Sequence, residues 1–100
     1  MLYYTQVIFI KDKQEETFDL FESNVLPLLK KHNGTLIYRI RPSQECFIEA
    51  STKLPYELHL VTFDTKQDFE NYVNDDDRKK YLSLKESSIE NAILIEGTLV

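Results

Sequence analysis

The chain has 100 residues, of which 12 are basic and 17 acidic, giving a formal net charge of −5. This length allows one domain with a single core, and the acidic excess argues against nucleic acid or an anionic membrane as a partner. The single cysteine excludes an internal disulfide, and two histidines without a spaced partner motif give no metal signature, so we expect neither a metal nor a cofactor.

The first predicted element is a β-strand at residues 2–10, LYYTQVIFI, which is rich in β-branched and aromatic side chains. The apolar run stops at Lys11 and has no basic segment before it, so it fits neither a membrane span nor a secretion signal. We therefore expect a cytoplasmic, soluble protein.

A helix is predicted for residues 15–31, where apolar side chains recur at helical spacing: Phe18, Phe21, Val25, Leu28 and Leu29. Pro27 predicts a kink or a restart, because proline removes one backbone hydrogen bond and crowds the preceding turn. Asn33 and Gly34 predict a left-handed cap at the end of the helix.

Two further strands follow the first helix. Residues 35–41, TLIYRIR, form the second strand, which Pro42 closes, and residues 56–63, YELHLVTF, form the third. Between them, residues 43–55 have no sustained period and are predicted as a long loop, although residues 46–50 would also fit a short extension of the strand.

The second helical region begins after the third strand. Thr65 and Asp68 resemble a capping box, and we expect Asn74 or Asp75 to cap a further helical segment, since contiguous aspartates lack the spacing of a calcium loop. Residues 89–99 form the last strand. The basic side chains of this region are predicted to face water: Arg78, Lys79 and Lys80.

The predicted order is β, α, β, β, α, β, which is the ferredoxin-like arrangement of the α+β class in a single domain covering residues 1–100. Right-handed crossovers then place the first and third strands at the centre of a four-stranded antiparallel sheet, with both helices on one face. The opposite face of the sheet must then be covered by something other than these two helices.

Alternation along the strands divides their side chains into apolar and mixed sets. We assign the apolar sets to the helix-covered face and the mixed sets to the open face, together with Gln6. The mixed sets are Ile37, Arg39 and Arg41 in the second strand and Glu57, His59, Val61 and Phe63 in the third. The register that pairs opposite charges sets Arg41 against Glu57, Arg39 against His59 and Ile37 against Val61. An exposed sheet face of this kind predicts back-to-back packing of two subunits, and hence a homodimer.

The passages LPLLKKHNGTLIYRIRP and VTFDTKQDFENYVNDDDRKKY resemble the dimeric α+β barrels, in particular small bacterial domains of unknown function related to antibiotic-biosynthesis-type monooxygenases. The resemblance covers nearly the whole chain. It implies a homodimer with a cleft for a small organic molecule, in a superfamily that hosts cofactor-independent oxygenation, haem degradation, lactone isomerisation and dye peroxidation. The chain lacks tryptophan and carries His32 at a helix end, which departs from the haem-degrading pattern.

The candidate site combines one base with one cation. His59 is a candidate general base or, alternatively, a histidine of the dimer contact. Arg39 is a candidate anion stabiliser or, alternatively, the partner of Glu57. Substrate-binding roles are predicted for Tyr4, Gln6, Tyr56 and Glu57. The resemblance and these residues together imply a small-molecule-binding protein, for which cofactor-independent monooxygenase or isomerase activity is one hypothesis and a non-catalytic ligand-sensing or interaction module is the alternative.

Overall fold

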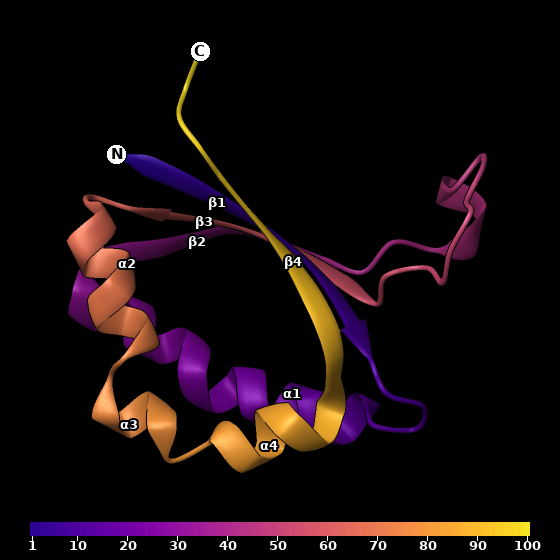
Figure 1. The fold of residues 1–100 in the computed structure, drawn as a ribbon, viewed down its shortest axis with the longest axis horizontal. Coiled ribbons are helices and arrows are strands. Elements are labelled where there is room, and N and C mark those ends of the chain that lie inside the picture. The colour runs from indigo at the N-terminus through magenta and orange to yellow at the C-terminus, as the bar shows by residue number, and fades with distance from the viewer.

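The structure is a computed structural model that describes all 100 residues. Four strands form one antiparallel sheet in the order β2-β3-β1-β4, and the helices lie together on one side of it (Figure 1). The strands are β1 (Leu2–Ile10), β2 (Gly34–Ile40), β3 (Glu57–Phe63) and β4 (Ile89–Gly97). The helices are α1 (Glu15–Val25), α2 (Lys66–Val73), α3 (Asp76–Lys79) and α4 (Leu82–Ser88), with 3-10 turns η1 (Leu26–His32) and η2 (Gln44–Cys46). The predicted ferredoxin-like order is confirmed, with the second helical region divided into three short helices.

The break predicted at Pro27 is present. The α-helix ends at Val25 and continues as the 3-10 turn η1, with the proline in its first turn. Asn33 follows with φ 57°, the left-handed cap that the sequence predicts. A Cβ on the next residue, Gly34, would lie 2.7 Å from a ring carbon of Phe63, so the chain enters β2 where only glycine fits without a shift.

Two further caps also agree with the sequence. The Thr65 hydroxyl accepts a hydrogen bond from the Asp68 backbone N–H at 3.1 Å and thereby begins α2. The Asp75 carboxylate accepts from the backbone N–H groups of Asp77 and Arg78 at 2.8 and 3.1 Å and begins α3.

The predicted register between β2 and β3 is correct at one end and wrong at the other. Arg39 lies opposite His59, as expected. Leu36, and not Ile37, lies opposite Val61, because an irregularity between Leu36 and Tyr38 places an extra residue in β2.

The assignment of the two sheet faces was wrong. Glu57, His59, Val61 and Phe63 are all buried on the face that the helices cover, and Gln6 shares this face because it pairs with His59. The mixed set can be buried because a helix and the neighbouring strand supply partners for its charges, which alternation within one strand cannot reveal. The open face is instead the apolar one. Its apolar side chains are Tyr3, Val7, Phe9, Tyr38, Ile40, Leu58, Leu60, Ile93 and Ile95, and its polar ones include Thr5, Thr35, Thr62 and Asn91.

Two hydrophobic clusters hold the helices against the sheet. One contains Tyr4 with Phe63 and Tyr72, and the other contains Ile8 with Phe18. Along β1, Gln6 lies between Tyr4 of the first cluster and Ile8 of the second. The polar side chains of the covered face therefore sit inside the layer that forms the core.

Residues 43–55 form the predicted long loop, which projects away from the sheet and the helices (Figure 1). It contains only the short turn η2, so the alternative of a strand extension at residues 46–50 is wrong. Ile48, at 97% exposure, makes almost no contact with the rest of the subunit. None of the helices is long and apolar enough to cross a lipid bilayer.

Candidate functional site

A cavity of about 350 Å³ lies between the covered face of the sheet and the helices. Its size falls within the range of small-molecule pockets, which are usually apolar with a few convergent polar groups. Most of its wall consists of the aromatic and aliphatic side chains of the core, Tyr4, Phe63 and Tyr72 among them. Five polar side chains also line it: Gln6, Glu22, His59, Arg78 and Lys85.

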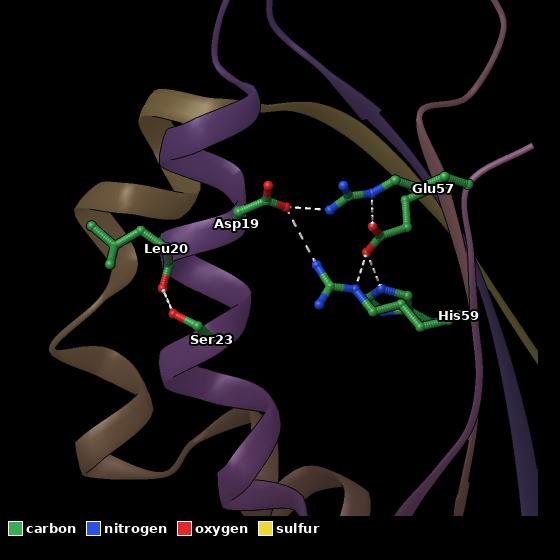
Figure 2. A network of polar contacts seen from close by, with 7 residues as sticks. Asp19, Leu20, Ser23, Glu57 and His59 are labelled. Atoms are coloured by element: carbon green, nitrogen blue, oxygen red, sulfur yellow. Dashed lines mark hydrogen bonds and ion pairs between the residues drawn. The ribbon is translucent and has the colours of Figure 1, made fainter.

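Beside the cavity, Glu57 is the centre of an ionic network that joins the sheet to α1 (Figure 2). Its fully buried carboxylate accepts hydrogen bonds from Nε of Arg39 at 2.8 Å and from Nε of Arg41 at 2.7 Å. Asp19 of α1 accepts from the outer nitrogens of the same two arginines. Burial alone would raise the pKa of Glu57, but the hydrogen bonds from His59, Arg39 and Arg41 lower it to about 2. Glu57 is therefore ionised.

His59 connects this network to the cavity. Its Nε2 lies 2.5 Å from Oε2 of Glu57, and the residue is only 3% exposed while lining the cavity wall. An ionised carboxylate only accepts hydrogen bonds, so Nε2 must carry the hydrogen. In the neutral ring Nδ1 then holds a free lone pair, and this atom makes no hydrogen bond with the protein. Glu57 thus fixes the tautomer and the orientation of a base.

Glu22 is a second acidic residue at the cavity and was missed by the sequence analysis. It is buried, lines the cavity, and makes no hydrogen bond or ion pair with another side chain. Burial raises the pKa of Glu22 more than the charges of His59, Arg39 and Arg78 lower it, which shifts its equilibrium towards the neutral acid. The signal was present in the sequence, because Glu22 follows Phe18 by four residues and therefore lies on the buried stripe of the helix.

The prediction that Arg78 faces water was wrong. Its guanidinium carbon lies 5.1 Å from the ring centre of Tyr72 and 5.9 Å from that of Phe21, and the side chain lines the cavity. Lys85 lines the same cavity, where burial, followed by the charge of Arg78, lowers its pKa. The apolar packing of the arginine stem and plane against aromatic rings explains the error, since charge alone indicated solvent. The next two residues, Lys79 and Lys80, are exposed as expected.

The six residues predicted for the site are divided between three places. Tyr4, Gln6 and His59 line the cavity. Glu57 and Arg39 belong to the ionic network beside it. Tyr56 lies outside both, with the guanidinium of Arg41 4.9 Å from its ring centre.

Tyr4 is a wall of the cavity with its hydroxyl already engaged. The hydroxyl donates a hydrogen bond to Oε1 of Glu96 at 2.7 Å. Burial and this hydrogen bond raise the pKa of Tyr4 to about 12. The phenol is therefore a poor acid near neutral pH, and the groups suited to proton transfer in this cavity are His59 and Glu22.

No family model matches this sequence, and no curated protein matches it significantly. Solved structures do match its fold. RPA0582, a protein of unknown function from Rhodopseudomonas palustris, superposes with a TM-score of 0.82 at 8% identity, over 99% of this chain and 82% of that one. A dimeric protein of unknown function with a ferredoxin-like fold, from Bacteroides fragilis, gives 0.69 at 8% identity, over 98% and 95% of the two chains.

A third structure, a dabb family protein with a ferredoxin-like fold from Mesorhizobium loti, gives a TM-score of 0.70 at 13% identity, over 99% of this chain and 96% of that one. These likenesses establish the fold. The chain is a ferredoxin-like α+β protein, and its structural neighbours include proteins of unknown function.

Proposed function

We propose that the protein is a homodimer in which each subunit binds a small organic molecule in the cavity and transfers a proton to or from it through His59. The observation that carries this proposal is the position of His59, a base held by a buried carboxylate at the wall of an otherwise apolar cavity. Such a site suits an isomerase, or an oxygenase that first deprotonates its substrate without a cofactor. The resemblance to antibiotic-biosynthesis-type monooxygenases remains a prediction made from the sequence.

The proposed proton transfer uses His59 as the base and Glu22 as the acid. Neutral His59 takes a proton from an acidic C–H group of the ligand onto Nδ1, and the imidazolium that forms is stabilised by the Glu57 carboxylate. Glu22 in its neutral form donates a hydrogen bond or a proton to the carbonyl oxygen on which negative charge develops. Return of a proton from His59 to a different carbon of the enol completes an isomerisation, with Glu22 recovering its own proton.

The homodimer is proposed on the apolar open face of the sheet. Ile93 and Ile95 of the edge strand β4 are 51% and 54% exposed, and Tyr38 and Ile40 of the opposite edge strand are exposed to a similar extent. A contiguous apolar face of this size is unusual for a monomer. A second copy covers it most directly, because the same face is then self-complementary about a two-fold axis.

One observation favours the second candidate, a non-catalytic ligand-sensing module. Arg39, the predicted anion stabiliser, donates hydrogen bonds to Glu57 and Asp19 and does not line the cavity. A cavity whose groups orient a ligand without activating it would serve a sensor equally well. The two candidates differ only in whether His59 receives a proton from the ligand.

Hydrogen–deuterium exchange into a neutral bicyclic ketone, 2-tetralone, separates the two candidates. The wild-type protein in D₂O is expected to accelerate loss of the α-proton signals in ¹H NMR spectra, and His59→Gln is expected to abolish that acceleration. The matched control is His32→Gln, since His32 bonds to Asp75 outside the cavity and is the other histidine of the chain.

Circular dichroism of both variants checks the fold. Binding of 2-tetralone without accelerated exchange would leave the sensor as the function. Absence of both binding and exchange would overturn the proposed use of the cavity.

A further inference from the structure

Arg78 differs from the other two arginines of the chain in having no acidic partner. Arg39 and Arg41 each contact both Glu57 and Asp19. Arg78 forms no ion pair, although the chain contains 17 acidic residues. Its Nε is the only buried side-chain nitrogen or oxygen that lacks a hydrogen-bond partner. An unpartnered buried donor of a charged group is costly, so it needs an explanation.

The arginine is nevertheless held firmly. Its plane lies near the rings of Phe21 and Tyr72, and Nη1 donates to the backbone carbonyl of Val73 at 3.4 Å. These contacts fix the guanidinium without neutralising it. Nε is buried, whereas Nη2 makes no hydrogen bond with the protein, so the outer end of the guanidinium keeps donors for a carboxylate.

The charges around the cavity favour an anion at this position. Lys85 adds a second cation to the wall, while the pKa shift of Glu22 favours its neutral form. Asp75, the acidic residue that begins the helix carrying Arg78, already accepts hydrogen bonds from Lys31, His32 and two backbone N–H groups. No acidic side chain therefore forms an ion pair with Arg78, although Glu22 lies on the same cavity wall.

We propose that Arg78 binds the carboxylate of the ligand, so that the cavity accepts an organic acid with an apolar, ring-sized body. This inference rests on the proposed function, because it names the class of molecule that the same cavity binds. The carboxylate pairs with the outer nitrogens of Arg78, and the apolar body packs against the core side chains that line the cavity. We thus assign to Arg78 the anion-binding role that the sequence predicted for Arg39.

A matched pair of probes tests the proposal: 2-naphthoate and its neutral amide, 2-naphthamide, titrated calorimetrically. The wild type is expected to bind the acid about tenfold more tightly than the amide, because the carboxylate forms a charge-assisted pair with a cation that has no ion-pair partner in the protein. Arg78→Met keeps the apolar stem and is expected to reduce that ratio to about one while leaving amide binding within about twofold. Lys79→Met removes the same charge from an exposed neighbour on the same helix and should keep the ratio.

A spectroscopic measurement on the wild type keeps the proposal testable if Arg78→Met does not fold. The ¹⁵N–¹H signals of the outer nitrogens of Arg78 should move downfield with 2-naphthoate and stay in place with 2-naphthamide. Equal affinity of the wild type for acid and amide, or a ratio that survives Arg78→Met, would overturn the anion site while leaving the cavity as a binding site. Failure of both probes to bind would count against the cavity itself.

Discussion

The two faces of the sheet reverse the usual relation between polarity and burial. The covered face carries the buried residues Glu57 and His59 together with the half-buried Gln6, whereas the open face carries Val7 and Leu58 with Ile93 and Ile95 of β4. Polar groups can be buried when each charge has a partner or borders a cavity, and apolar groups can stay exposed when another molecule covers them. The interaction partners of the side chains, and not the polarity of the strand alone, therefore decide which face of the sheet is buried.

The largest effect is expected from a charge placed on the open face. Ile95→Lys should turn a dimer into a monomer, because a two-fold interface would bury two unpaired ammonium groups, at about 3 kcal/mol or more, over 100-fold in the dissociation constant. Light scattering after gel filtration at micromolar concentration measures the mass. Leu20→Lys is the control, since Leu20 of α1 is equally exposed, at 53%, but lies off the sheet. A wild-type monomer would refute the proposed cover of this face.

On the covered face, Glu57→Gln is expected to lower the free energy of unfolding by roughly 3 kcal/mol, because two arginines and a histidine lose their shared carboxylate. The loss should depend on pH. The pKa of Glu57 is lowered from 4.5 to about 2, so its stabilisation is present above the unfolded value and disappears as the pH falls towards 2. Urea unfolding at several pH values, followed by circular dichroism, measures both effects.

Glu16→Gln is the matched control for this substitution. Glu16 lies exposed on α1 and has no ion-pair partner, so its replacement should change stability by no more than about 0.5 kcal/mol. A difference between wild type and Glu57→Gln that stayed constant from neutral pH to pH 2 would show that the ionisation of Glu57 does not hold the network together.

The sequence predicts elements and caps well because these depend on nearby residues. Pro27, Asn33 and the Thr65 cap act within a few positions of themselves, and the structure confirms all three. The covered face was predicted wrongly because its charges are neutralised from another element: Asp19 of α1 contacts arginines about twenty residues away. Arg78 was missed at the cavity for a similar reason, since its environment is set by aromatic rings of two other helices. His59 could be chosen as a candidate base from the sequence because the chain has only two histidines, and the structure places it at the cavity wall.

Replacement of Glu22, the second buried glutamate, should change stability in the opposite direction to replacement of Glu57. Glu22 has no partner, and burial raises its pKa, so its charged form destabilises the folded state as the pH rises above the unfolded value. Glu22→Gln is expected to stabilise the protein by on the order of 1 kcal/mol near pH 8 and to have almost no effect near pH 4, where both states are protonated. Thermal and urea unfolding across this range measure the difference. A loss of stability at pH 8 would mean that Glu22 has an ionic partner after all.

The smallest effect is expected from Asp19→Asn, which sharpens the contrast between a buried and an exposed partner of the same two arginines. Asp19 is 46% exposed at its side chain, whereas Glu57 is fully buried. Water and salt screen an exposed pair, so the free energy of unfolding should fall by no more than about 0.5 kcal/mol, and about 1 M salt should remove most of that difference. Urea unfolding at low and high salt provides the measurement. The contrary outcome is that Asp19→Asn lowers the free energy of unfolding as much as Glu57→Gln does, with no dependence on salt. The two carboxylates would then act as one unit, and the burial of Glu57 would not explain its larger contribution to stability.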